Sequence, residues 1–209
     1  MKIPSTIPPE LAEVIGLHLG DGCLVRYDYG GKRISEMALT GNASEYPYYD
    51  TFVKPTLESS LGVTGRLYLR TSDNTTRYVV YSKPLVDYFE SLGLPLGKKR
   101  DASIPRVIFE QGQVVPCIRG VYHAEGSIYR RYSKAYKGHA RVYDGLLALQ
   151  IRTKLKTLMG QIAEELARLG IICNRLTEAD GVYTLRVTKQ CEIAKFMSVI
   201  QPRLKTTPH

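Results

Sequence analysis

Residues 14–22 read Val-Ile-Gly-Leu-His-Leu-Gly-Asp-Gly, and residues 118–126 repeat the pattern as Ile-Arg-Gly-Val-Tyr-His-Ala-Glu-Gly. In both copies two small residues lie four positions apart, so on a helix they share one face with almost no side-chain bulk. Such faces let two helix backbones pack in close contact. The glycine after each acid, Gly22 or Gly126, predicts a helix end in the left-handed conformation.

Each copy therefore places an acid, Asp21 or Glu125, at a helix C-terminus. That end carries partial negative charge, which disfavours a carboxylate there by roughly 0.3–1 kcal/mol. If the two small-residue faces pack together, the two carboxylates converge and a cation should offset their repulsion. Mg²⁺, held by one or two carboxylates plus phosphate oxygens, fits this arrangement. A single copy would fit an ordinary core helix better than a metal site, so the pair carries the prediction.

At these residues the chain resembles the LAGLIDADG homing endonucleases, specifically the single-chain, two-motif kind found in archaeal introns. The resemblance covers nearly the whole chain, since motif spacing, length and the pattern between the motifs all agree. It implies an α+β fold of two pseudo-symmetric αββαββα halves. Each half would be a four-stranded antiparallel sheet with helices on one face, and together they would form a DNA-binding saddle.

The order of expected elements supports this duplication. The first half predicts α-β-β-α-β-β-α, with a helix to residue 21, strands within 23–39, a helix over 48–61, strands at 66–70 and 75–81, and a helix over 84–92. Pro55 predicts a kink or break in the second of these helices. The second half repeats the order, with a helix over 115–125, strands within 127–152 and a basic connection over 130–137, a helix over 154–169, a hairpin at 179–181, and a helix over 191–200. We therefore expect halves 1–96 and 114–209, joined by a basic linker over 97–113.

The amino-acid composition limits the classes of protein to which this chain can belong. The chain has 209 residues, 44% of them hydrophobic, and a net charge of +9, which favours a polyanionic partner such as duplex DNA. The cysteines show no C-x-x-C spacing, so neither a zinc site nor a disulfide framework is indicated. No compact His-Asn-His pattern or two-His zinc spacing appears, which disfavours other nuclease chemistries. With no long apolar run and no signal-peptide pattern, we expect a soluble, intracellular, cytoplasmic monomer without membrane contact.

The resemblance implies metal-assisted hydrolysis of one phosphodiester in each strand of a long asymmetric double-stranded target, leaving short 3′ overhangs. Asp21 and Glu125 would hold Mg²⁺, with the backbone carbonyls of Gly20 and Ala124 as further ligands. Mn²⁺ is expected to substitute, and Ca²⁺ to bind without supporting cleavage. The resemblance thus implies a magnesium-dependent endonuclease that acts in intron homing.

Family members often carry a lysine or glutamine near each acid, at the end of a strand just before the following helix. Lys154 matches this position in the second half, whereas the first half has Asn42 there. Lys98 or Arg130 is then the candidate cation on the first side. His18 and His123 lie within the helices that should pack together, so we expect them to serve packing rather than catalysis.

DNA contacts are expected from outward-facing strand residues and from the linker. A two-stranded ribbon fits the major groove, where arginine suits guanine and glutamine suits adenine. The candidates on strands are Arg26, Asp28, Arg33, Ser35, Arg66, Tyr68, Arg70, Arg77, Arg130, Gln150, Arg152 and Arg186. Lys98 and Lys99 in the linker are candidates for phosphate contact.

Two other readings stay open from the sequence alone. The first is a non-cleaving nucleic-acid-binding module on the same scaffold, such as an intron RNA maturase or a DNA-binding regulator. Both acids are present, which favours the enzyme. The second is a nuclease domain of an intein, but no self-splicing segments flank the motifs.

Overall fold

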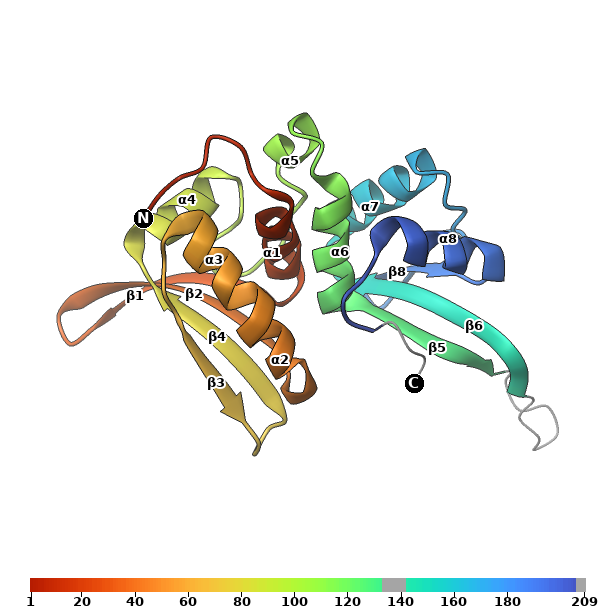
Figure 1. Cartoon of the computed structure of the whole chain (residues 1–209), viewed down its shortest axis with the longest axis horizontal. Helices are drawn as coiled ribbons and strands as arrows, with labels where there is room; N and C mark the ends of the chain where they lie inside the picture. Colours follow the sequence, from red (N-terminus) through yellow and green to blue (C-terminus); the bar gives the residue numbers. More distant parts are fainter. Residues whose placement is uncertain (133–141, 206–209) are drawn as a thin grey trace.

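The computed structural model describes residues 1–132 and 142–205, and Figure 1 shows two halves of similar plan. The first half contains α1 (Pro9–Asp21), β1 (Gly22–Tyr29), β2 (Lys32–Asn42), α2 (Tyr46–Tyr48), α3 (Lys54–Leu61), β3 (Arg66–Arg70), β4 (Thr75–Tyr81) and α4 (Lys83–Ser91). After the short α5 (Arg106–Glu110), the second half contains α6 (Val114–Glu125), β5 (Gly126–Tyr132), β6 (Val142–Thr153), α7 (Lys156–Arg168), β7 (Thr177–Ala179), β8 (Val182–Val187) and α8 (Gln190–Ile200). The predicted order is confirmed in both halves. Most of the expected basic connection over 130–137 lies outside the described residues.

Each half is built on one four-stranded antiparallel sheet. The strand orders are β1-β2-β4-β3 and β5-β6-β8-β7, so the second sheet repeats the topology of the first. In Figure 1 the helices cover one side of each sheet, and the two sheets spread away from the central α1 and α6 like the flaps of a saddle. Apolar side chains from the helices and the covered sheet faces form one core cluster through both halves. Each helix in the described part of the chain is too short or too polar to cross a bilayer.

The contact between α1 and α6 depends on the small residues of the motif. A Cβ added to Gly16 would lie 1.9 Å from the carbonyl oxygen of Cys117, and one added to Gly120 would lie 1.9 Å from that of Glu13. Because no side chain fits at these distances, the backbones touch where the sequence predicted. This contact holds the two halves together at their centre.

The glycines after the two acids have a different role from the predicted one. Gly22 and Gly126 are extended, with φ of −90° at both, so the expected left-handed helix ends are wrong. Each helix instead runs directly into a strand. A Cβ on Gly22 would lie 2.6 Å from the Cα of His18, and one on Gly126 would lie 2.4 Å from the carbonyl oxygen of Tyr122. Space, rather than backbone angle, requires glycine there.

The kink or break expected at Pro55 takes the form of a π-helical turn just before the proline. A π-helical turn over Tyr49–Val53 joins α2 to α3, and Pro55 occupies the first turn of α3, where a missing N–H does no harm. Gly62, with φ of 63°, ends α3 in the left-handed conformation. The helix therefore continues through the predicted position, with a π-helical turn between its two α-helical pieces.

Candidate active site and nucleic-acid interface

Asp21 and Glu125 meet where α1 and α6 end together. A Cβ on Gly20 would lie 2.2 Å from the Cβ of Ala124 and 3.0 Å from the Cγ of Glu125, which places the second acid against the end of the first helix. Burial raises the pKa of Asp21. Burial, and then the Asp21 carboxylate, raise the pKa of Glu125 to about 7. The structure therefore brings together two half-buried carboxyl groups that disfavour each other's charge.

A pocket of about 940 Å³ opens on the Asp21 side, and we call it the Asp21 pocket. The first half contributes Asp21, Asn42 and Glu45 to its lining, among others, and the second half contributes Ala124 and the stretch Arg203, Leu204 and Lys205. A pocket of about 510 Å³ opens on the other side, and we call it the Glu125 pocket.

The Glu125 pocket follows the same plan with the halves exchanged. Glu125, Arg152 and Lys154 come from the second half, whereas Gly20 comes from the first half and Lys99 from the segment that follows it. Each pocket thus combines the acid and sheet of one half with the helix end of the other half and a lysine that follows that half's last helix. Lys154 lies beside Glu125 as the sequence predicted.

The two lysines contact helix ends in matching ways. The Nζ of Lys99 donates to the carbonyls of His18, Leu19 and Gly20 at 2.9, 3.1 and 2.5 Å. The Nζ of Lys205 donates to the carbonyl of Ala124 at 3.0 Å. A cation at a helix C-terminus is favoured by the helix dipole and offsets the neighbouring carboxylates.

Electrostatic effects agree with this crossed arrangement. Burial raises the pKa of both acids, but Lys205 opposes that rise at Asp21 more than Lys99 does. At Glu125 the order is reversed, since Lys99 has the larger opposing effect.

Lys205 was missed at the sequence level, because it lies beyond the last predicted helix and has no motif around it. Lys99 was expected only as a phosphate contact, and Lys98 beside it is exposed.

Asn42 lines the Asp21 pocket, but its side chain is already engaged. Its Oδ1 accepts hydrogen bonds from the backbone N–H and the hydroxyl of Ser44 at 2.9 and 2.8 Å. Its own N–H donates to Oε2 of Glu45 at 3.2 Å, which completes a capping box. Burial raises the pKa of Glu45, and Asp21 adds to that rise. Glu45 is thus a further carboxyl in this pocket, and the Asn-x-x-Glu capping pattern was the signal for its position.

The donor set suits Mg²⁺ when phosphate oxygens complete it. Within residues 1–132 and 142–205, no group of three or more His, Cys, Asp or Glu side chains is placed to hold a metal on its own. Asp21 and Glu125 supply carboxylates, and the site already attracts the cationic groups of Lys99 and Lys205. Mg²⁺ is commonly bound by one or two carboxylates plus substrate phosphates and water, so the residues present fit it. The carbonyls of Gly20 and Ala124 accept lysine hydrogen bonds here, which leaves each with one lone pair.

Seven of the predicted DNA contacts lie on the open sheet faces. In the first sheet the register pairs Tyr68 with Arg77, on the face opposite the buried Tyr78. In the second it pairs Gln150 with Arg186, opposite the buried Leu149. The strand alternation then gives the full set on the open faces: Arg66, Tyr68, Arg70, Arg77, Gln150, Arg152 and Arg186.

Five predicted contacts lie on the other face, so their outward orientation was wrong. Arg26 bonds Asp87 and Glu90 of α4 at 2.6 and 2.8 Å, and its register partner Ser35 is buried. The remaining three follow the same alternation: Asp28 pairs with Arg33 at 3.1 Å near the hairpin turn, and Arg130 stands opposite Leu147. A shift of one residue moves every side chain of a strand to the opposite face. Because β1 carries polar residues on both faces, its sequence did not show which face the helices cover.

The true open face of β1 carries residues that the sequence did not single out. The hydroxyl of Tyr27 donates to Oε2 of Glu36 at 3.0 Å, and Arg77 bonds Oε1 of the same carboxylate at 2.6 Å. Tyr29 and Tyr81 are exposed on this face. The two tyrosines at positions 27 and 29, two residues apart, were the sequence signal that could have identified this open face.

Both histidines of the motif helices are fully buried, as expected. Burial lowers the pKa of each to about 3, so both rings are neutral. His18 packs edge-on against Phe89, with ring centroids 5.5 Å apart. Neither ring lines one of the two pockets.

Comparison with solved structures identifies the architecture. The chain matches the homing endonuclease I-DmoI in complex with DNA and Mn (22% identity, 96% of this chain and 98% of that chain, TM-score 0.62) and with DNA and Ca (21%, 96% and 93%, TM-score 0.63). It also matches the LAGLIDADG meganuclease I-AabMI bound to uncleaved DNA (13%, 93% and 83%, TM-score 0.61). No protein-family model and no curated protein sequence matches it. The chain has the two-domain saddle fold of the LAGLIDADG homing endonucleases.

Proposed function

We propose that this protein is a site-specific, magnesium-dependent DNA endonuclease that cuts both strands of a long asymmetric target. The observation that carries the proposal is the convergence of Asp21 and Glu125 between two crossed pockets, each with its own lysine. The relatives solved with DNA, Mn and Ca share the whole fold, which supports duplex DNA as the partner and a divalent metal as the cofactor. Open sheet faces rich in arginine suit the two half-sites.

We assign two roles to the side chains of the site, which are metal binding and stabilisation of charge on the phosphate. Asp21 and Glu125 would hold Mg²⁺, which when bound supplies Lewis-acid stabilisation and lowers the pKa of a water. Lys99 and Lys205 lie where they can stabilise the charge of a phosphate in the opposite half's pocket. Lys154 adds a cation in the Glu125 pocket. Asn42 forms a capping box with Glu45 and so fixes the position of that carboxylate in the Asp21 pocket.

The chain is proposed to act as a monomer with two DNA-binding halves, 1–96 and 114–209, joined by residues 97–113. Pseudo-symmetry supports this division, because each half supplies one acid, and the stretch of chain that follows the last helix of each half supplies one lysine. Open-face residues would then contact bases and phosphates. An intracellular site of action and a role in intron homing follow from the same proposal.

The test is a cleavage selection on a randomised duplex library, with Mg²⁺ in one arm and chelator in the other. The proposal predicts recovery of one long target with short 3′ overhangs, only in the Mg²⁺ arm. Binding of a preferred duplex without cleavage in Mg²⁺ or Mn²⁺ would contradict it and favour a non-cleaving binder. No feature of the two pockets specifically favours that alternative, because both acids are present and accessible.

A further inference from the structure

Lys205 reaches the Asp21 pocket on residues 201–205, which follow α8 without forming a helix or strand, and we call them the post-α8 segment. Gln201 ends α8 in the left-handed conformation, with φ of 51°. The chain then crosses toward the first half. Since the segment lacks the regular hydrogen bonds of a helix or strand, its position depends on the side chains that it meets.

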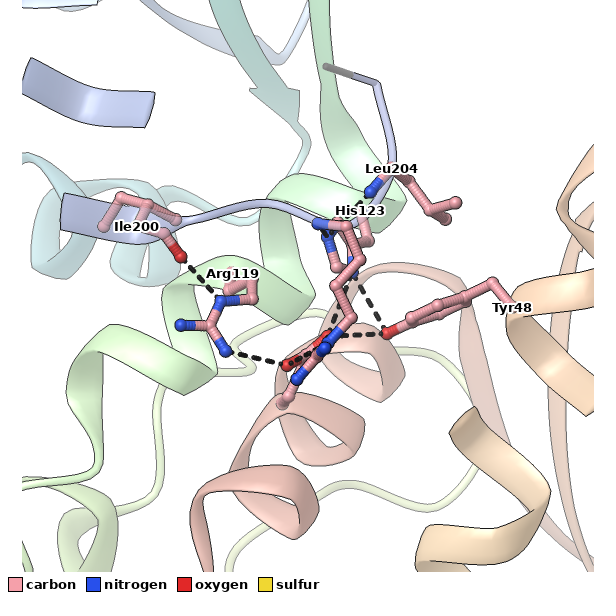
Figure 2. Close-up of polar contacts among 7 residues, drawn as sticks. Tyr48, Arg119, His123, Ile200 and Leu204 are labelled. Atoms are coloured by element: carbon pink, nitrogen blue, oxygen red, sulfur yellow. Dashed lines mark hydrogen bonds and ion pairs between the residues drawn. The ribbon is translucent and has the colours of Figure 1, made fainter. Parts of the chain in front are cut away.

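The second half holds the backbone of this segment. Nε2 of His123 accepts the N–H groups of Arg203 at 2.9 Å and Leu204 at 3.3 Å. Figure 2 shows His123 and Leu204 close together, with Tyr48 on the other side of the ring. The hydroxyl of Tyr122 donates to the carbonyl of Lys205 at 3.0 Å. Because Nε2 accepts, the neutral ring carries its proton on Nδ1, which lies 3.0 Å from the hydroxyl of Tyr48.

The first half holds the side chain of Arg203 through Glu13. Nε of Arg203 lies 3.1 and 3.3 Å from the two carboxylate oxygens of Glu13, which is fully buried in α1. Arg119 of α6 donates to the same carboxylate at 3.1 Å, and the Tyr48 hydroxyl donates to it at 3.1 Å. A buried carboxylate requires such partners, because an unpaired charge in the interior is strongly disfavoured.

A cation–π contact adds to this attachment. The guanidinium of Arg203 lies 4.3 Å from the ring centroid of Phe52, and that ring stacks on Tyr48 at 5.2 Å. Arg203 therefore joins the post-α8 segment to two elements of the opposite half, two residues before Lys205.

The mirror-image lysine is held in another way. The motif repeat aligns Glu13 with Cys117, so α6 has no matching carboxylate. The segment before Lys99 is instead held by backbone pairing with β1, through the N–H of Gly97 to the carbonyl of Leu24 at 2.7 Å and a bridge between Leu24 and Leu96. The ion pair at Glu13 thus serves only the Lys205 side of the molecule.

We propose that Glu13 and Arg203 are positioning residues, whose ion pair across the two halves holds the post-α8 segment so that Lys205 reaches the Asp21 pocket. This inference rests on the proposed endonuclease function, since Lys205 acts there on one scissile phosphate. Arg203 also lines the Asp21 pocket. Its guanidinium is engaged by Glu13 and by the ring of Phe52, so it can act by holding the segment without touching the reacting atoms. Loss of the pair should therefore affect one DNA strand and spare the other.

The test measures single-turnover cleavage of each strand of the duplex recovered in the selection above, in Mg²⁺. Lys205→Met should slow one strand by about 10²-fold, and Arg203→Ala should slow the same strand by about 10- to 100-fold because the lysine is misplaced. DNA affinity and the rate on the other strand should stay within about threefold, so nicked product accumulates. In the Lys205→Met background, Arg203→Ala should add less than about twofold.

Lys99→Met is the mirror-image variant and should slow the opposite strand. Arg106→Ala is the matched control, because Arg106 is exposed on α5 and pairs with Glu110 of its own helix. It should leave both strands unchanged. Arg203→Lys keeps the charge and should restore part of the lost rate.

A second measurement needs no DNA. Amide hydrogen exchange over 201–205 should rise about tenfold or more in Arg203→Ala and Glu13→Gln, and stay unchanged in Arg106→Ala. Equal slowing of both strands, additive effects of Arg203→Ala and Lys205→Met, or unchanged exchange would overturn the positioning role. A wild-type protein that cuts no duplex would instead count against the endonuclease, and the exchange result would still decide whether the ion pair holds the segment.

Discussion

The two pockets share a plan but differ in content. Each combines one half's acid with the other half's helix end and the lysine that follows that half's last helix, yet the Glu125 pocket also holds Lys154 and Arg152. The Asp21 pocket has the larger volume, and the matching strand registers place Asn42 where the other pocket has Lys154 and Thr40 where it has Arg152, with Glu45 as a further carboxyl. Duplication has thus kept the backbone frame and the crossed lysines, while the charge around each acid has diverged. The features common to both pockets are the ones that we expect the chemistry to require.

The largest expected effect is the loss of either acid. Asp21→Asn and Glu125→Gln should each lower cleavage by about 10³-fold or more, because several kcal/mol of metal-dependent stabilisation is removed. Binding of the selected duplex should change little, since the sheets hold it. Strand-resolved cleavage and a binding assay in Ca²⁺ measure the two effects separately. Equal loss of binding and cleavage would contradict these roles.

The next effect tests the symmetry of the helix contact. Gly16→Ala and Gly120→Ala each place a Cβ 1.9 Å from a backbone oxygen, and both should destabilise the protein by about 1–3 kcal/mol or more. Gly160→Ala is the control, because Gly160 lies in α7 with open space around it and should gain up to about 1 kcal/mol. Urea unfolding gives all three values. Tolerance of alanine at 16 or 120 would show that the backbones do not touch.

A third prediction concerns the coupling of the two acids. Burial and then Asp21 raise the pKa of Glu125 from 4.5 to about 7, so Asp21→Asn should move its titration to lower pH. Carboxyl NMR of the metal-free protein measures the midpoint. Because the folded state binds this proton more tightly, metal-free protein should lose stability as pH rises from 4.5 to 7. An unchanged midpoint in Asp21→Asn would place the two carboxyl groups too far apart to share a cation.

The smallest effect compares the two faces of the first sheet. Arg66→Ala, on the open face, should weaken DNA binding by about 3- to 10-fold and lower its salt dependence. Arg26→Ala, on the helix side, should change affinity by less than about twofold, because Arg26 is engaged by Asp87 and Glu90. Fluorescence anisotropy at several salt concentrations distinguishes the two. Similar losses from both variants would contradict the assigned faces.

Much of the fold followed from local signals. The repeated motif predicted the contact of α1 with α6, and alternation in β3 predicted the open face of Arg66 and Arg70. The face of β1 did not follow, because Arg26 and Asp28 are polar residues on the helix-covered side and reverse the apparent pattern. Gly22 was assigned a left-handed turn because sequence cannot distinguish a need for space from a need for positive φ.

The residues of the site likewise fall into those with a local sequence signal and those without one. Asp21, Glu125 and Lys154 could be located because each belongs to a motif or ends a strand. Lys205 could not, since its position depends on Arg203 and a buried carboxylate almost the whole chain away at Glu13. Contacts of that range leave no local pattern in the sequence.

The most direct test is a crystal structure of the protein with its selected duplex and Ca²⁺. We predict at least one Ca²⁺ bound by both Asp21 and Glu125 and by phosphate oxygens, with Lys205 near the scissile phosphate in the Asp21 pocket and Lys99 near the one in the Glu125 pocket. Acids that bind no cation beside the DNA backbone, or lysines that approach no phosphate, would contradict the account.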